Sequence, residues 1–230
     1  MSAFFKKIYI WIDYNTGDFS ELIYAFPLIV FIGLMYSIFR LLYIKRRSGD
    51  NFNKNQIKKA NELIRMLFIL WYTSLCFMTL FPTHFWQALW SSCLFEMNIF
   101  HEMRTIRFSG WDFVPDIISY IADGHLNWFF PSLRFKTTDY IENVLLFVPL
   151  GIMLPLSFKK QSFIRVILTG MCSSFLIEFV QGFIGRDGDI DDLIFNTLGT
   201  AIGFLLYLFV KKMFPKFTRK CQTFSLSDNF

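Results

Sequence analysis

Long apolar segments divide the chain into five predicted membrane-spanning helices. About 20 consecutive apolar residues cross a hydrocarbon core of roughly 30 Å, because a helix rises about 1.5 Å per residue. The first such segment runs from Leu22 to Ile44, and we expect Arg40, near its end, to reach the lipid headgroups. The other predicted spans are approximately Leu63–Phe81, Ile141–Phe158, Gln161–Ile184 and Leu193–Val210.

The composition agrees with a membrane protein. Of the 230 residues, 54% are hydrophobic and 18% are charged, whereas a soluble domain has roughly 45–50% apolar and about 25% charged residues. This balance excludes a disordered chain, a coiled coil, collagen and a disulfide-rich secreted scaffold. The sequence therefore predicts the all-α class, as a polytopic transmembrane helical bundle of about five spans.

The distribution of Lys and Arg predicts the orientation of the bundle. The segments that follow the first, third and fifth spans carry 13 of the 23 Lys and Arg residues, and the segments on the other side carry 7. By the positive-inside rule, the N-terminus lies outside and the C-terminus lies in the cytoplasm. The net charge of +5 is thus a topology signal, and we expect no nucleic-acid partner. No cleavable signal peptide is predicted.

A long aromatic segment, residues 82–140, lies between the second and third spans on the predicted outer side. Aromatic side chains favour the membrane–water interface, so short interfacial helices are the leading interpretation. A re-entrant segment between Phe85 and Phe100 and a small folded outer domain are the alternatives. His84, His101 and His125 lack the spacing of metal ligands, and we expect neither a metal nor a cofactor.

Polar residues occur near the outer ends of the last three spans. Glu178 shares one face of the fourth span with Ser174 and Gln181. Ionisable residues inside a membrane are costly, and they mark functional sites more often than their apolar neighbours do. Because successive spans alternate in direction, polar residues of three spans and one short loop reach the same depth. The predicted ligand-binding residues are Asn143, Glu178, Gln181, Arg186, Asp189, Asp192 and Asn196.

Each of these residues also has a structural interpretation. Glu178 and Arg186 could form an ion pair at the end of the fourth span. The acidic residues Asp189, Asp191 and Asp192 could instead cap the fifth span and favour the positive end of its dipole. Small or kinking residues indicate close helix packing, and they are Pro149, Gly151, Gly199 and Gly203.

These motifs together resemble those of the VanZ-like family of bacterial membrane proteins. The resemblance rests on Asn143-x-x-x-Phe147-x-Pro149-x-Gly151, on Glu178-x-x-Gln181, and on Arg186-x-x-Asp189-x-x-Asp192-x-x-x-Asn196-x-x-Gly199-x-x-x-Gly203. It covers roughly residues 140–210, and the segment from Trp111 to Pro115 loosely resembles a Pro-containing segment of the family. The resemblance implies a multi-pass protein of the bacterial cell membrane. In the founding members it implies low-level resistance to teicoplanin-type glycopeptides.

The resemblance suggests three parts. Residues 1–60 form an N-terminal extension with the first span and a basic cytoplasmic loop. Residues 61–212 form the VanZ-like membrane domain, which includes the outer loop 82–140. Residues 213–230 form a frayed cytoplasmic tail.

The leading hypothesis is that the polar cluster binds a ligand of the cell envelope. The candidates are a lipid-linked wall precursor, a lipid headgroup and a glycopeptide. Arg186 would bind a phosphate or carboxylate of this ligand. The side-chain amides of Asn143, Gln181 and Asn196 would supply hydrogen bonds. A membrane enzyme is a second hypothesis, because clustered carboxylates can act as acid and base or hold a divalent metal. A third is a transporter that forms oligomers through the face of Gly199 and Gly203. The fourth is a membrane adaptor whose polar cluster is purely structural.

Overall fold

The computed structural model describes residues 3–16, 20–48, 58–81, 85–95, 108–115, 131–158 and 160–222. Helices account for most of these residues, so the predicted all-α class is confirmed. The helices are α1 (Ala3–Thr16), α2 (Ser20–Ser48), α3 (Lys59–Thr79), α4 (Phe85–Phe95), α7 (Pro131–Ser157), α8 (Phe163–Gln181), α9 (Ile190–Met213) and α10 (Pro215–Cys221). The two short strands are β1 (Trp111–Asp112) and β2 (Gly188–Asp189).

Five of the described helices are long and apolar enough to cross a membrane, which confirms the predicted number of spans. Their membrane-compatible segments are Glu21–Arg46, Lys59–Thr79, Asp139–Ser157, Phe163–Gln181 and Ile190–Met213. Many large apolar side chains on these helices are exposed, including Leu34 and Leu205, each 58% exposed. Such a surface is stable when it faces lipid instead of water.

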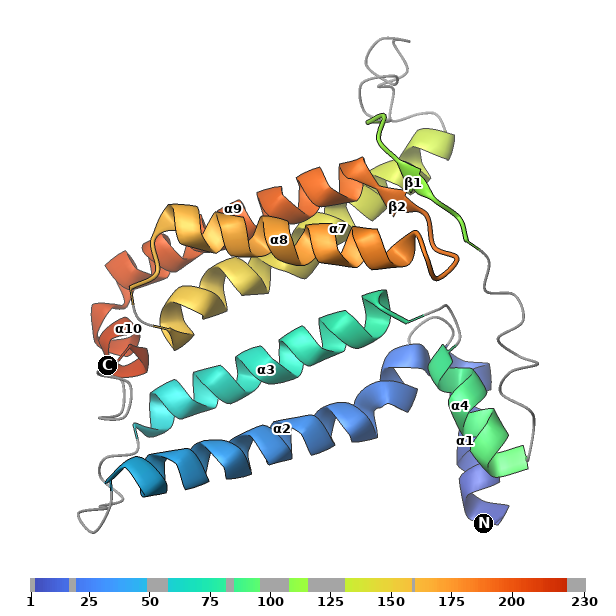
Figure 1. The fold of residues 1–230 in the computed structure, drawn as a ribbon, viewed down its shortest axis with the longest axis horizontal. Coiled ribbons are helices and arrows are strands. Elements are labelled where there is room, and N and C mark those ends of the chain that lie inside the picture. Colours follow the sequence, from blue (N-terminus) through green and yellow to red (C-terminus); the bar gives the residue numbers. More distant parts are fainter. Residues whose placement is uncertain are drawn as a thin grey trace.

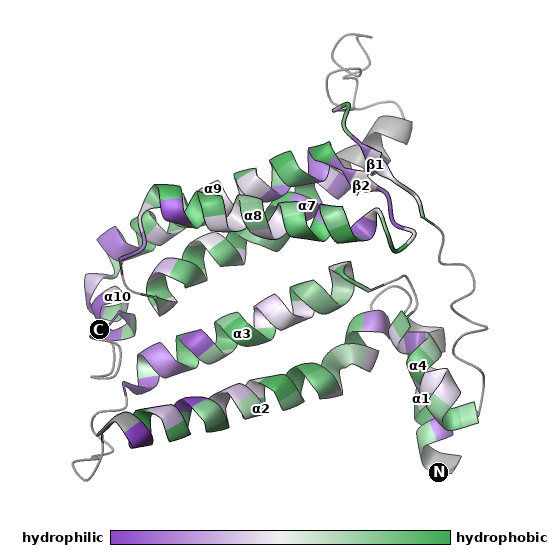
Figure 2. Cartoon of the chain, viewed as in Figure 1, coloured by the Kyte–Doolittle hydropathy of each residue, from purple (hydrophilic) through white to green (hydrophobic). Residues whose placement is uncertain are grey.

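The spans are arranged as two groups of helices (Figure 1). Helices α7, α8 and α9 pack together, while α2 and α3 run side by side in opposite directions, and α3 joins the two groups through its contacts with α7 and α8. Figure 2 shows that hydrophobic residues fill the middle of the spans and that hydrophilic residues gather towards their ends. The first and last of the described helices, α1 and α10, lie at opposite ends of the bundle.

The closest contact in the bundle joins α7 and α9, where glycine residues allow the two helix backbones to touch. A Cβ atom on Gly199 would collide with the backbone carbonyl of Val144, and one on Gly203 would collide with that of Val148. In the same way, Gly151 of α7 lies directly against the backbone of α9. Small residues allow helix backbones to approach in membranes, where van der Waals contact drives association. This face is occupied within the chain, so it is not available for the oligomer that the transporter hypothesis requires.

Charged residues stabilise the bundle at the end where α10 lies. Arg40 of α2 forms a forked ion pair with Glu62 of α3, with Nε–Oε2 and Nη2–Oε1 distances of 3.1 Å each. Arg40 therefore has an acidic partner on α3, and its contact with lipid headgroups stays a prediction. Arg65 donates from Nε to the carbonyl of Ser157 at 2.8 Å, which ties α3 to the end of α7.

The expectation of a frayed tail is wrong for residues 215–222. Pro215 begins α10, as proline often does in the first turn of a helix. The side-chain amide of Asn61 donates to the carbonyl of Cys221 at 2.7 Å, and the Gln222 amide donates to the hydroxyl of Tyr207 at 2.8 Å. These long-range hydrogen bonds fold the tail back against α3 and α9. Residues 223–230 lie outside the described residues.

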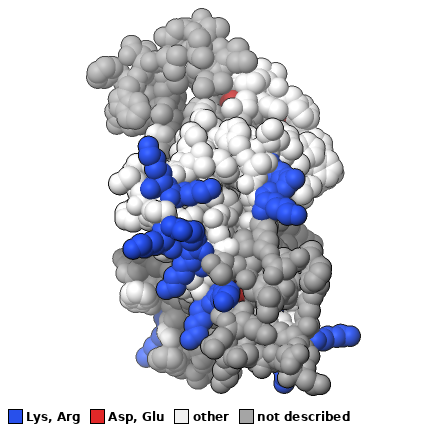
Figure 3. Space-filling model, turned by 90° about the vertical axis from the view of Figure 1, so that its left-hand side faces the viewer, with Lys and Arg blue, Asp and Glu red and all other residues white. Residues whose placement is uncertain are grey.

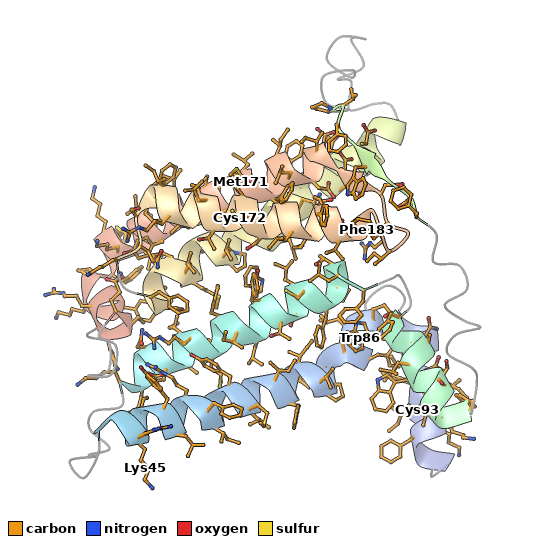
Figure 4. The ribbon with its side chains drawn as sticks, viewed as in Figure 1. Lys45, Trp86, Cys93, Met171, Cys172 and Phe183 are labelled. Carbon is orange, nitrogen blue, oxygen red and sulfur yellow. The ribbon has the colours of Figure 1, made fainter. Side chains whose placement is uncertain are left out.

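A short helix forms in the predicted outer loop. Helix α4 packs beside α1 and against the start of α2 (Figure 1). Glu21 of α2 accepts the backbone N–H of Trp86 at 3.0 Å, and the Trp86 indole donates to the carbonyl of Phe77 at 3.0 Å. Trp86 thus lies at the junction of α2, α3 and α4 (Figure 4). Most of the remaining outer loop, including all three histidines, lies outside the described residues.

Candidate functional site

The predicted site residues all lie at the end of the bundle opposite α10. Helix α8 ends there, α9 begins there, and the two are joined by a loop of eight residues, 182–189. The first half of α7 and the last turn of α3 reach the same end. Phe183, which is labelled in Figure 4, marks this end of α8. Alternating helix direction therefore brings the seven residues to one end, but their side chains have different partners.

Glu178 and Asp189 connect α8 to the start of α9. The Glu178 side chain is only 7% exposed, and its Oε2 accepts the backbone N–H of Asp189 at 3.1 Å. Asp189 is the N-cap of α9, and its Oδ1 accepts the N–H of Asp191 at 2.8 Å. A capping carboxylate satisfies a free N–H and lies at the positive end of the helix dipole. The capping interpretation therefore holds for Asp189.

Two further acidic residues of α9 bind residues in the first half of α7. The side-chain amide of Asn143 donates to Oδ1 of Asp192, and the hydroxyl of Tyr140 donates to Oδ2 of Asp191 at 3.2 Å. Asp191 is completely buried. Burial of a carboxylate is costly unless it receives hydrogen bonds, so these contacts help to fix α7 on α9.

Asn196 lies deeper between the helices than the acidic residues do. Its side-chain amide donates to the hydroxyl of Ser174 at 3.0 Å, and both residues are buried. One turn further, Thr200 occupies the space that the missing side chain of Gly170 leaves. Asn196 therefore joins α8 to α9 within the bundle, as an interhelical hydrogen bond does in many membrane proteins.

Gln181 and Arg186 are directed at α3. The Gln181 amide donates to the carbonyl of Thr79 at 3.2 Å, and Nη1 of Arg186 donates to the carbonyl of Met78 at 2.9 Å. The last carbonyls of a helix lack partners in the helix itself, so these two side chains satisfy the C-terminus of α3. Among the described residues, Glu178 and Arg186 form no ion pair, and that structural interpretation is wrong.

A segment of the outer loop closes over the α8–α9 loop. Strands β1 and β2 pair in parallel, with Trp111 opposite Gly188 and Asp112 opposite Asp189. The indole ring of Trp111 lies against Gly182 and Gly188, where a Cβ atom would overlap it. The ring also contacts Phe183, with the ring centres 5.0 Å apart. These two glycines are therefore required by the close approach of one aromatic ring.

The two strands, α8 and the first turn of α9 enclose a groove of about 410 Å³. Of the seven predicted residues, Glu178 and Asp189 line it. Within the described residues, Oε1 of Glu178 has no protein hydrogen-bond donor, and Glu178 is one of the residues that line the groove. The complete lining is Trp111, Asp112, Phe113, Phe175, Glu178, Phe179, Gly188, Asp189, Ile190 and Leu193.

The groove was not foreseen from the sequence, although several of its residues were. Trp111 and Asp112 belong to the segment that loosely resembles the family, and the sequence Trp-Asp-Phe-Val-Pro was the available signal. Tyr140, which binds Asp191, gave no signal beyond its position before the third span. The partners of Arg186 and Gln181 also lie about a hundred residues away in the chain, where no local pattern points to them.

The electrostatic environment of this end is negative. Asp139, Asp189 and Asp191 lie close enough to Asp192 to act on its charge. Asp189 and Asp192 act on that of Glu178, where the positive charge of Arg186 opposes them. In the described part of the chain, however, no three His, Cys, Asp or Glu side chains are grouped so that they could hold a metal ion. The arrangement can accept hydrogen bonds from a bound molecule and attract positive charge.

Comparisons with known proteins give a family match. The family model VanZ/LLP1 matches residues 22–211 of the chain. The chain is also similar to "Protein VanZ" of Enterococcus faecium, with 37% identity over 71 residues, which is 30% of this chain and 44% of that protein. The match thus spans less than half of that relative. No solved structure matches the chain.

Proposed function

The chain belongs to the VanZ/LLP1 family, and from this premise we propose that it binds a ligand of the cell envelope in the Glu178 groove and thereby lowers susceptibility to teicoplanin-type glycopeptides. It is a multi-pass bacterial membrane protein. The candidate ligands are a lipid-linked wall precursor, a lipid headgroup and the glycopeptide itself.

The proposal places the groove on the outer side of the membrane. Lys and Arg side chains gather on the opposite end of the bundle, which faces the viewer in Figure 3. This end includes the exposed residues Lys45, Lys211, Lys212 and Lys216. Cytoplasmic segments carry an excess of Lys and Arg, so the basic end is assigned to the cytoplasm and the acidic end to the outside. Glycopeptides act on wall components on that outer side.

The observation that carries the proposal is the free carboxylate oxygen of Glu178. Glu178 is a buried residue, and the carboxyl group of a buried residue is ordinarily fully hydrogen-bonded. Here one oxygen accepts the N–H of Asp189, no described residue donates to the other, and Glu178 is one of the residues that line the groove. A buried polar group without a protein partner is costly for stability, and such groups are often retained for binding or catalysis.

The role that we first expected for Arg186 changes in this proposal. Its guanidinium is occupied at the C-terminus of α3 and does not line the groove. Arg186 and Gln181 therefore act on the site indirectly, because they hold α3 against the loop that carries Asp189. Asn143, Asp192 and Asn196 position α7 and α8 against α9 in the same indirect way.

The proposal is tested by the substitution Glu178→Gln in a host in which the unaltered chain lowers teicoplanin susceptibility. The glutamine oxygen can still accept the N–H of Asp189, so the fold is retained while the charge is lost. We expect cells with this variant to be as susceptible as cells without the protein. The matched control is Glu142→Gln, which removes an exposed carboxylate at the same end and should leave the effect unchanged. An unchanged phenotype of Glu178→Gln at normal abundance would contradict the proposal.

A further inference from the structure

Helix α10 carries a row of positive side chains on its outward side. Lys216, Arg219 and Lys220 are exposed, and the last two lie three and four positions after the first, so they share one side of the helix. Thr218 and Cys221, on roughly the opposite side, are 1% and 2% exposed. We call the three exposed cations the α10 basic row. It is separate from the Glu178 groove, because α10 lies at the other end of the bundle (Figure 1).

Hydrogen bonds on the buried side hold the α10 basic row in a fixed position. The Asn61 amide donates to the carbonyl of Cys221 at 2.7 Å, and the Gln222 amide donates to the carbonyl of Pro155 at 3.1 Å. Helix α10 is therefore attached to α3 and α7, and its basic side stays outward. A row of cations that is already in place loses less conformational freedom on binding than a flexible tail does.

Further positive charges surround the α10 basic row. Lys211 and Lys212, in the last turn of α9, and Lys45 of α2 are exposed, and Figure 3 shows how Lys and Arg gather on this face. The acidic side chain that the structure describes near them, Glu62, forms an ion pair with Arg40. The described residues of this end thus have an excess of positive charge, which attracts an anionic partner.

Exposed phenylalanine rings beside the α10 basic row indicate that this partner belongs to a lipid bilayer. Phe214 and Phe217 are 59% and 50% exposed, and they follow Phe209, which is 59% exposed on a membrane-compatible helix. Aromatic rings next to Lys and Arg are typical of segments at the membrane–water interface. A soluble polyanion would neutralise the cations and leave these rings in water, whereas a lipid headgroup neutralises the cations while the bilayer covers the rings.

We infer that the α10 basic row binds the headgroup of an anionic membrane lipid, with Phe214 and Phe217 in the headgroup layer of the same leaflet. In the orientation proposed above, this is the cytoplasmic leaflet. A zwitterionic lipid gains less from the same cations, because they repel its ammonium group. The inference goes beyond the proposed function, and it stands or falls independently of any ligand in the Glu178 groove.

The experiment compares phosphatidylglycerol, an anionic lipid, with phosphatidylcholine, a zwitterionic lipid with the same acyl chains. The purified full chain in detergent is mixed with both lipids, and native mass spectrometry measures the bound fraction of each. One Lys or Arg near an anionic headgroup gives roughly a fivefold preference, so we expect the parent chain to prefer phosphatidylglycerol at least about tenfold. The combined substitutions Lys216→Gln, Arg219→Gln and Lys220→Gln should reduce this preference to about twofold, since the neighbouring cations remain.

The matched control keeps the charge of the α10 basic row and exchanges the types of cation. The combined substitutions Lys216→Arg, Arg219→Lys and Lys220→Arg should retain the preference of the parent chain. Circular dichroism and size-exclusion chromatography check that both triple variants are folded.

Salt gives a second test that needs no variant. A rise in ammonium acetate from about 0.1 M to about 1 M shortens the screening length from roughly 10 Å to 3 Å, so the preference of the parent chain should fall several-fold. Equal binding of the two lipids by the parent chain would overturn the inference. A preference that the glutamine variant keeps, that the charge-retaining control loses, or that salt does not change would overturn it as well.

Discussion

At the scale of single residues, Glu178 and Arg186 show how similar sequence signals lead to different roles. Both are ionisable residues near the end of the fourth span. The carboxylate of Glu178 lines a groove, whereas the guanidinium of Arg186 satisfies a carbonyl of α3. The direction of the helices predicted that they lie at one end of the bundle. It could not predict their partners, because the carbonyl of Met78 lies 108 residues earlier in the chain.

Because Arg186 satisfies the C-terminus of α3, its removal should lower the stability of the protein while the residues that line the groove stay unchanged. In Arg186→Ala, the carbonyl of Met78 loses its donor, and we expect the free energy of unfolding to fall by about 1–3 kcal/mol. Thermal unfolding of the purified protein in detergent measures this effect. Lys212→Ala, which removes an exposed cation at the other end, is the control and should unfold like the parent chain. A variant as stable as the parent would show that the hydrogen bond to Met78 does not stabilise α3.

At the scale of helices and strands, hydropathy was sufficient to predict the five spans, but it did not predict the short helix α10 or the two short strands. The five apolar segments are long, and each matches the thickness of a membrane, so their existence followed from the sequence. Strands β1 and β2 have two residues each and pair across more than seventy positions, which leaves no periodic signal. Helix α10 is short and basic, and its position depends on hydrogen bonds from α3 and α9 that no local pattern reveals.

The close contact between α7 and α9 predicts that one added methyl group at Gly199 strongly destabilises the bundle. In Gly199→Ala, the new methyl would collide with the backbone carbonyl of Val144, which cannot move away as a side chain can. We expect a loss of roughly 1–3 kcal/mol, as in other overpacked interiors, and a lower abundance in the membrane.

The matched control for this substitution is Gly33→Ala in α2. Its methyl would meet only the end of the flexible Leu70 side chain, so the packing can adjust. Abundance in membranes and the thermal unfolding midpoint should change much less in this control. Equal effects of the two substitutions would contradict the close backbone contact that we assign to Gly199.

At the scale of the whole molecule, the separation of charge along the bundle carries the proposed orientation. Basic residues gather at the end with α10, and acidic residues gather at the end with the groove. The Lys and Arg counts predicted this polarity before any fold was known, because topology depends on the total charge of each segment and not on its detailed structure. The groove was not predictable in this way, since it exists only where β1 meets β2 and α8.

Labelling of single cysteines tests this orientation. In a chain with Cys93→Ser, a cysteine in place of exposed Asp187 should react with a membrane-impermeant maleimide in intact cells. A cysteine in place of exposed Lys216 should react only after the membrane is permeabilised. The reverse pattern would place the groove in the cytoplasm and would remove the proposed access to envelope ligands.

Occupancy of the groove in living cells is the central claim, and photo-crosslinking tests it most directly. Benzoylphenylalanine would replace Phe175 in the groove or, as the control, Phe209 on the exposed surface of α9. The account predicts that irradiation attaches a defined envelope molecule at position 175 and not at 209, and that Glu178→Gln abolishes this product. The same background of products at both positions, or a product at 175 that Glu178→Gln leaves unchanged, would contradict it.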